Sequence, residues 1–318
     1  MAIEIGPGWT IGSGITISSP PTGATASWFG GGFAPGVRSI VDRITYATDT
    51  ATATVRGPLS LAVFYTSATG TNTYGWYALG SNGSVNNSII TRITYTNDSV
   101  ASTDRGPLTL VNYAQAATTD TTTYGWFGGG GPSLAPGGYS VVNRIVFATD
   151  TATASSKGPL SLGRYSLAAT GTTSYGWFAG GNGTPAGYST IDRIEYANDT
   201  ATASVRGPLS ASRWYLAASG DGTTYGYYVA GRNSLGTIST VDRITFANDT
   251  GSLTTRGPYV AETRNLAGSG NDVYGYFGGG DVGSTVGRIT YATDTATAAT
   301  KGPLSAARYA LASSAGTQ

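Results

Sequence analysis

The sequence contains no cysteine and no histidine, and each absence removes a class of chemistry. Without cysteine the chain can form no disulfide and can offer no thiolate to a metal ion. Without histidine it lacks the commonest general base, the commonest metal-ligating side chain and the usual switch at physiological pH. We therefore expect no metal site, no cofactor and no catalytic residues.

Charge and long apolar runs are also scarce. Charged residues make up 11% of the chain and the formal net charge is +1, which gives no electrostatic reason to expect nucleic acid or an anionic membrane as a partner. No apolar run approaches the roughly 20 residues that a membrane-spanning helix requires. Residues 1–22 lack the basic region and apolar core of a signal peptide, and we expect them to form an extended N-terminal arm.

What the chain has instead is an internal repeat. An aromatic residue recurs at spacings of 48 to 51 residues, followed each time by an Arg-Ile pair and then a Gly-Pro pair. The aromatic column is Trp28, Trp76, Trp126, Trp177, Tyr227 and Tyr276. The arginine column is Arg43, Arg92, Arg144, Arg193, Arg243 and Arg288, and the Gly-Pro pairs begin at Gly57, Gly106, Gly158, Gly207, Gly257 and Gly302.

Each copy reads as four short antiparallel strands. In the fourth copy, apolar residues around Leu167 break at Thr170-Gly171 and resume at Tyr175, which predicts a hairpin with a glycine turn. Residues 191–196 form the expected third strand and residues 201–206 a short outer strand. Repeats of about 40 to 50 residues built from short strands are typical of propeller blades. The sequence therefore predicts an all-β domain, residues 23–318, folded as a six-bladed β-propeller.

The two ends of the repeat complement each other. Residues 24–32 form a second strand with no first strand, and residues 308–312 form a first strand with no second. We expect them to pair, so that the C-terminal strand closes the ring on the N-terminal blade and hides both sheet edges.

The repeat resembles the kelch repeat. A kelch blade has an arginine at the start of the innermost strand and a glycine pair at the end of the second. The matching residues here are Arg164, Arg213, Arg264 and Arg308, with the pairs Gly129-Gly130, Gly180-Gly181 and Gly279-Gly280. The chain departs from this pattern where Val63 and Asn112 replace the arginine and where the second copy reads Leu79-Gly80. The resemblance implies the same propeller fold.

Residues that recur once per blade are interpreted as scaffold, because a ligand site breaks symmetry. We expect the repeated arginines and the aspartates of the third turn to form salt bridges or turn hydrogen bonds. The tryptophans are expected to pack between neighbouring blades, the alternative being that they line sugar-binding clefts as in some six-bladed lectins. These aspartates are Asp49, Asp98, Asp150, Asp199, Asp249 and Asp294.

The variable parts of the repeat are the loops after the second strand. In kelch-like blades these loops share a face with the connections between blades, so we predict that they ring one end of the central channel and form a binding face. The alternative is that they are glycine-rich turns with no ligand. The predicted binding residues are Phe33, Arg38, Asn86, Asn87, Tyr139, Tyr188, Arg232, Asn233 and Asp281.

These features favour a non-catalytic structural or adhesive module. The N-terminal arm is similar to the N-termini of structural proteins of tailed phages infecting cyanobacteria, which implies a virion or otherwise extracellular location. In this hypothesis the arm binds a protein partner in a larger assembly and the loop face contacts a host surface glycan. The alternative is a soluble carbohydrate-binding or protein-binding propeller without a virion role.

Overall fold

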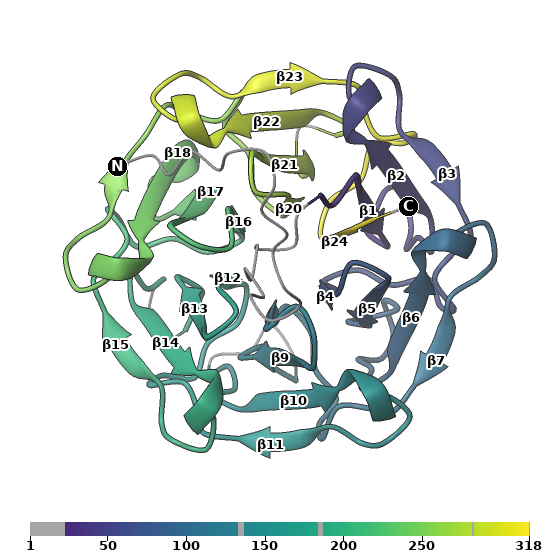
Figure 1. Ribbon diagram of the computed structural model, residues 1–318, viewed down its shortest axis with the longest axis horizontal. Coiled ribbons are helices and arrows are strands. Elements are labelled where there is room, and N and C mark those ends of the chain that lie inside the picture. Colours follow the sequence, from purple (N-terminus) through teal and green to yellow (C-terminus); the bar gives the residue numbers. More distant parts are fainter. Residues whose placement is uncertain (1–22, 133–136, 184–186, 282, 318) are drawn as a thin grey trace, which may run out of the picture.

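The computed structural model describes residues 23–132, 137–183, 187–281 and 283–317, and the expected arm at residues 1–22 lies outside them. Six four-stranded antiparallel sheets are arranged as blades around a central axis (Figure 1), which confirms the predicted six-bladed propeller. Among the described residues, no helix has the length and hydropathy needed to cross a membrane.

The strands of each blade run from the axis outward. Blade 1 contains β24 (Ala312–Gly316), β1 (Ala26–Gly30), β2 (Val41–Thr45) and β3 (Thr54–Arg56), and blade 2 contains β4 (Ser67–Gly70), β5 (Tyr74–Ala78), β6 (Ile90–Thr94) and β7 (Thr103–Arg105). Blade 3 contains β8 (Ala116–Thr119), β9 (Tyr124–Gly128), β10 (Val142–Val146) and β11 (Ser155–Lys157), and blade 4 contains β12 (Ala168–Gly171), β13 (Tyr175–Ala179), β14 (Ile191–Glu195) and β15 (Ser204–Arg206). Blade 5 contains β16 (Ala217–Gly220), β17 (Tyr225–Asn233), β18 (Gly236–Thr245) and β19 (Thr254–Thr255), and blade 6 contains β20 (Leu266–Gly270), β21 (Tyr274–Gly279), β22 (Val286–Thr290) and β23 (Ala299–Lys301).

A short 3₁₀ helix follows the third strand of every blade. These helices are η1 (Tyr46–Thr48), η2 (Tyr95–Asn97), η3 (Phe147–Thr149), η4 (Tyr196–Asn198), η5 (Phe246–Asn248) and η6 (Tyr291–Thr293). The prediction that Tyr196 belongs to the third strand is wrong, because β14 ends at Glu195 and Tyr196 begins η4. The outer strand is likewise shorter than expected and spans Ser204–Arg206.

The first hairpin of blade 4 also differs from the expectation. Thr170 and Gly171 lie within β12, and the turn follows at residues 172–174. Gly171 is needed for close approach, since an added Cβ would come within 2.5 Å of Thr118 Oγ1 on the inner strand of blade 3 and 2.7 Å of Tyr175 O. The glycine therefore allows the inner strands of blades 3 and 4 to approach each other closely near the axis.

The two chain ends close the ring as predicted. β24 pairs with β1 in an antiparallel register that runs from Ala26 opposite Gly316 to Gly30 opposite Ala312. The strand begins at Ala312, so the predicted segment 308–312 was placed too early. Residues 308–311 instead lead into this strand, and β1 is paired on both edges, with β24 on one side and β2 on the other.

The aromatic column forms the contacts between neighbouring blades. Each of its members is at most 1% exposed and stacks on the first residue of the next blade's 3₁₀ helix. The ring centroids are 3.9 Å apart for Trp126 and Tyr196, with planes inclined by 6°. The predicted packing between blades is confirmed. The alternative that these tryptophans line sugar clefts is wrong, because a buried ring offers no face to a sugar.

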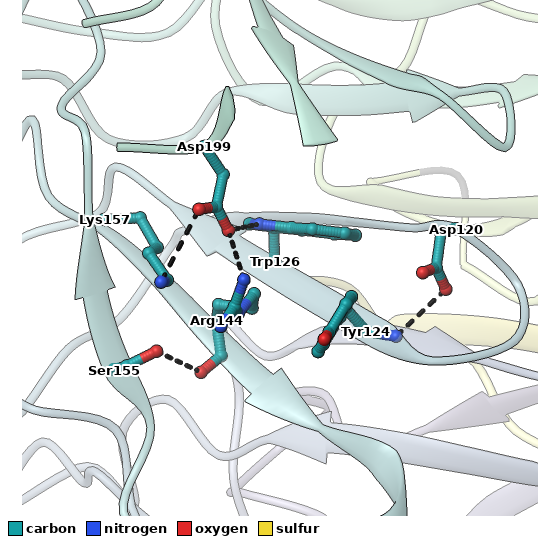
Figure 2. A network of polar contacts seen from close by, with 7 residues as sticks. All are labelled: Asp120, Tyr124, Trp126, Arg144, Ser155, Lys157 and Asp199. Atoms are coloured by element: carbon teal, nitrogen blue, oxygen red, sulfur yellow. Dashed lines mark hydrogen bonds and ion pairs between the residues drawn. The ribbon is translucent and has the colours of Figure 1, made fainter. Parts of the chain in front are cut away.

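The repeated charges tie the same blades together (Figure 2). Asp199 of blade 4 accepts hydrogen bonds from Trp126 Nε1 and Arg144 Nη1 of blade 3, both at 3.0 Å, and Lys157 Nζ lies 3.5 Å from its other oxygen. The arrangement recurs around the ring and closes where Tyr276, Arg288 and Lys301 of blade 6 hold Asp49 of blade 1. The interpretation of these columns as inter-blade salt bridges is confirmed.

Candidate functional site

The loops after the second strands gather on one face, which we call the loop face. Each loop lies beside a segment that leads into an inner strand, as the bridges between Phe64 and Ser81, between Tyr113 and Gly131, and between Trp214 and Arg232 show. This confirms the predicted placement of the loops around the end of the channel. The opposite face, here called the turn face, is formed by the hairpin turns between first and second strands.

A closed ring of backbone hydrogen bonds surrounds the axis on the loop face. One residue per blade adopts a left-handed conformation with φ between 54° and 60°, and its N–H donates to the carbonyl of the corresponding residue in the preceding blade at 2.6 to 3.0 Å. Such a conformation is costly for residues other than glycine, so the surrounding structure must hold it. The ring residues are Tyr65, Ala114, Ser166, Tyr215, Asn265 and Ala310.

Aromatic side chains close the axis beside this ring. Tyr65 of blade 2 and Tyr215 of blade 5 stack with their centroids 6.0 Å apart, and Tyr113 packs edge-on against Tyr65 at 5.5 Å. The rings of Phe64 and Phe33 extend the cluster, 5.6 Å apart. Burial raises the pKa values of Tyr65 and Tyr113 above the ordinary tyrosine range. We call these five residues the aromatic cap.

Of the aromatic cap only Phe33 was predicted as a site residue, although the sequence carries a signal for two further members, Phe64 and Tyr113. The seventh residue after the glycine of each Gly-Pro pair is aromatic in five of the six copies, as counting along the chain shows. These residues are Phe64, Tyr113, Tyr165, Trp214 and Tyr309, and the sixth copy has Arg264.

The same count corrects the arginine column that opens the inner strands. The sixth residue after each such glycine is Arg164, Arg213 or Arg308 in three blades, and their side chains are fully buried against Asp192, Asp242 and Asp42 at 3.0, 3.2 and 2.7 Å. In blade 6 this position is Thr263, so assigning Arg264 to it was wrong by one residue. Arg264 lies on the loop face with Asp281 instead.

Where the buried arginine is missing, its partner is missing as well. Val63 in blade 2 is accompanied by Thr91, and Asn112 in blade 3 by Asn143. In blade 6 the partner position is Gly287, where Tyr259 fills the space and its hydroxyl accepts a hydrogen bond from the Gly287 N–H at 3.1 Å. A buried charge without its counter-charge is expensive, so the two positions must change together.

A hollow with a volume of about 450 Å³ lies between the loops of blades 2 and 3. Phe64, Tyr65 and Tyr113 of the aromatic cap line it, together with Ser81, Ser84, Val85, Asn86, Val111 and Pro132.

Two buried polar groups in the segment that follows Asn112 have no partner, and one of them, Tyr113, lines this hollow. Asn112 Nδ2 donates to Gln115 Oε1 at 2.6 Å and to Gly129 O at 2.8 Å. Within the described part of the chain, neither the Tyr113 hydroxyl nor Gln115 Nε2 has a hydrogen-bond partner, although both are buried. Such orphaned groups are rare in folded proteins and call for an explanation.

Two of the predicted binding residues belong to this cluster. Phe33 packs on Phe64, and Asn86 lines the hollow while its Nδ2 donates to Pro132 O. Asn87 Nδ2 donates to Gly80 O at 3.1 Å and therefore braces the loop of blade 2. Whether these residues bind a ligand stays a prediction.

The other predicted residues are spread around the rim of the loop face. Arg38 Nε bonds to Ala34 O at 3.0 Å within its own loop, and Asp281 pairs with Arg264 at 2.7 Å. Tyr139 and Tyr188 are half-buried, and the backbone carbonyl of each accepts a hydrogen bond from the backbone N–H of the buried arginine in the next blade. Arg232 and Asn233 belong to the long β17–β18 hairpin, and Asn233 Oδ1 accepts hydrogen bonds from backbone N–H groups in its turn.

Within the described ranges, no group of three or more Asp, Glu, His or Cys side chains is placed to hold a metal ion. No protein-family model matches the sequence, and no curated protein matches it. The solved structure of YjhT superposes with a TM-score of 0.63 at 10% identity, covering 79% of this chain and 86% of that one. At this identity the likeness shows the fold alone: the chain is a six-bladed β-propeller.

Proposed function

We propose that the protein is a non-catalytic adhesive module of kelch type that binds a surface glycan through its loop face. The observation that carries this proposal is the hollow between blades 2 and 3. The inter-blade contacts recur from blade to blade, whereas this hollow lies between blades 2 and 3, a neighbouring pair in which Val63 and Asn112 replace the buried arginine. The third blade without it, blade 6, lies between two blades that keep it. A site that breaks the symmetry of a repeat is where a ligand is to be expected.

The chemistry of the hollow suits a sugar. Sugars present apolar C–H faces that pack on aromatic rings and hydroxyl groups that bond to amides and hydroxyls. Phe64 and Tyr65 are half-buried and supply such rings, and Ser84 and Asn86 supply the polar groups. The blades beneath hold the loops on a rigid support, as binding loops require.

The distribution of carboxylates supports a non-catalytic role. Glycoside hydrolysis needs two carboxyl groups facing one substrate. The six repeated aspartates are engaged between blades, and Asp42, Asp192 and Asp242 are buried in ion pairs. The three buried arginines at the start of inner strands support the kelch resemblance, because they occupy the position that the kelch repeat gives to arginine.

The position of the chain ends supports attachment of the module to a larger assembly, such as a virion. Thr25 N donates to Gly316 O at 2.8 Å and Thr317 N to Asn72 O at 2.8 Å, so both described ends lie on the turn face. A protein partner bound there through residues 1–22 leaves the loop face free to meet a glycan outside the cell.

A glycan array tests the binding function. We expect the wild-type protein to bind a subset of glycans, Phe64→Ala to lose this binding, and Trp214→Ala, the same truncation in blade 5, to keep it. Failure of the wild type to bind any glycan, or equal binding by Phe64→Ala, contradicts the proposal. Mass spectrometry of purified particles from the source tests the virion role, and absence of the protein from them favours a soluble lectin.

A further inference from the structure

We infer that the hollow between blades 2 and 3 accepts uncharged sugars and discriminates against sugars that carry a carboxylate. This inference rests on the proposed function and names the class of glycan that the same site takes.

The first observation is the absence of charge in the sequence around the hollow. The segments 59–68, 81–88 and 108–117, which with Pro132 supply its lining residues, contain no Asp, Glu, Lys or Arg. The segments of blades 4, 5 and 1 that correspond to 59–68 and 108–117 each contain one buried arginine, namely Arg164, Arg213 and Arg308. Blades 2 and 3, which form the hollow, are a neighbouring pair that lacks it. Blade 6, which has Thr263 at this position, lies between two blades that keep the arginine.

The arginine beside the aromatic cap, Arg264, already has its charge neutralised by Asp281. Arg264 lies over the ring of Tyr215, with 5.9 Å between its Cζ and the ring centroid, and it pairs with Asp281 at 2.7 Å. A sugar carboxylate that entered the hollow would exchange its hydration shell for aromatic and aliphatic side chains with no cation in the lining. Burying a carboxylate without a counter-charge is strongly unfavourable, so acidic sugars bind more weakly.

An uncharged sugar finds suitable partners in the same place. Val85 and Val111 are 58% and 48% exposed at the hollow, and with Phe64 they offer apolar surface to a pyranose ring. Asn86 and Ser84 offer an amide and a hydroxyl to its hydroxyl groups. These are the neutral hydrogen-bonding groups that orient a ligand in a mostly apolar pocket.

The second, independent observation is the Tyr113 hydroxyl. Tyr113 lines the hollow, is 3% exposed, and its hydroxyl has no hydrogen-bond partner among the described residues. A neutral hydroxyl on the ligand can both donate to and accept from this group, since a phenol does both. Because burial raises its pKa, Tyr113 stays uncharged and adds no repulsion of its own.

Isothermal titration with paired probes tests the inference. The probes are galactose-, glucose- and mannose-terminated oligosaccharides, each compared with its sialylated or glucuronylated counterpart. We expect the neutral members to bind at least tenfold more tightly than the acidic ones. Val111→Arg, which places a cation at the hollow, is expected to reduce this ratio several-fold, whereas Leu162→Arg, an exposed leucine in blade 4, leaves it unchanged. Circular dichroism confirms that both variants are folded.

The outcomes separate the two claims. Equal or tighter binding of acidic glycans, still abolished by Phe64→Ala, overturns the inference about charge and leaves the proposed glycan binding intact. Neutral binding that Phe64→Ala leaves unaffected overturns the location. Failure of every probe and of the glycan array overturns the proposed function and this inference together.

Discussion

Tyr65 and Tyr215 stack across the propeller axis, with ring centroids 6.0 Å apart and planes inclined by 22°. They come from blades 2 and 5, which lie three blades apart in the ring (Figure 1). Together with the hydrogen-bonded ring beside them, they obstruct the loop-face end of the channel. A ligand on this face is therefore expected beside the axis, where the hollow between blades 2 and 3 opens.

Acidification is predicted to weaken the contact between blades 6 and 1, in which Asp49 binds Arg288 and Lys301. Burial raises the pKa of Asp49, but hydrogen bonds from Tyr276 and Lys301 and the charge of Arg288 outweigh it, so the pKa is below its ordinary value. A lowered folded-state pKa gives stability that is present above the unfolded pKa of about 4 and lost as pH falls through the folded value. We expect Asp49→Asn to be less stable than the wild type by about 2 kcal/mol at pH 7. Urea unfolding should show this gap closing below pH 4, and a pH-independent gap would contradict the assignment.

The glycine of each Gly-Pro pair is predicted to be irreplaceable where blades meet. A Cβ on Gly207 would lie 1.7 Å from the Gly251 carbonyl oxygen, so Gly207→Ala must push blades 4 and 5 apart. We expect a loss of about 3 kcal/mol or more, since overpacking of a tight contact is at the upper end of such effects. Gly251→Ala is the matched control, because nothing lies within 4 Å of its added Cβ. Equal thermal stability of the two variants would show that the contact is not tight.

Replacing both members of the buried pair Arg213–Asp242 is predicted to cost less stability than replacing Arg213 alone. Arg213→Val should cost about 3 to 5 kcal/mol, because Asp242 would remain buried without a counter-charge. Adding Asp242→Thr reproduces the Val63 and Thr91 combination that blade 2 carries naturally. We expect the double variant to recover most of the loss in chemical denaturation. A double variant as unstable as the sum of both single changes would contradict this coupling.

Removal of residues 306–318 is predicted to open the ring. The deletion takes away β24 and leaves the edge of β1 unpaired, together with Asp42 without Arg308. Exposed strand edges template association, so we expect aggregation. Light scattering after size-exclusion chromatography measures it. A truncated protein that stays monomeric and folded would contradict closure by the termini.

The repeat made the architecture predictable from sequence. Blade number, ring closure and the inter-blade role of the tryptophans and charges all follow from columns such as Asp199 with Arg144, because each blade must meet its neighbour in the same way. Boundaries were less predictable: Tyr196 was assigned to a strand, although its ring must turn out of the sheet to stack on Trp126.

The site was predictable only in its placement. The loops were located correctly, but the members of the aromatic cap other than Phe33 were missed, because they precede the inner strands and their meeting depends on left-handed residues such as Tyr65. Which side chains meet across the axis, as Tyr65 and Tyr215 do, depends on the three-dimensional closure of the ring. Counting from Gly257 would have shown that Thr263, and not Arg264, occupies the position of the buried arginines.

A crystal structure of the protein with the tightest-binding neutral oligosaccharide tests the central claim most directly. The account predicts a sugar ring in the hollow between blades 2 and 3, packed on Phe64 and within hydrogen-bonding distance of Asn86. Sugar bound only at the turn face, or only beside Trp214 in blade 5, would contradict it.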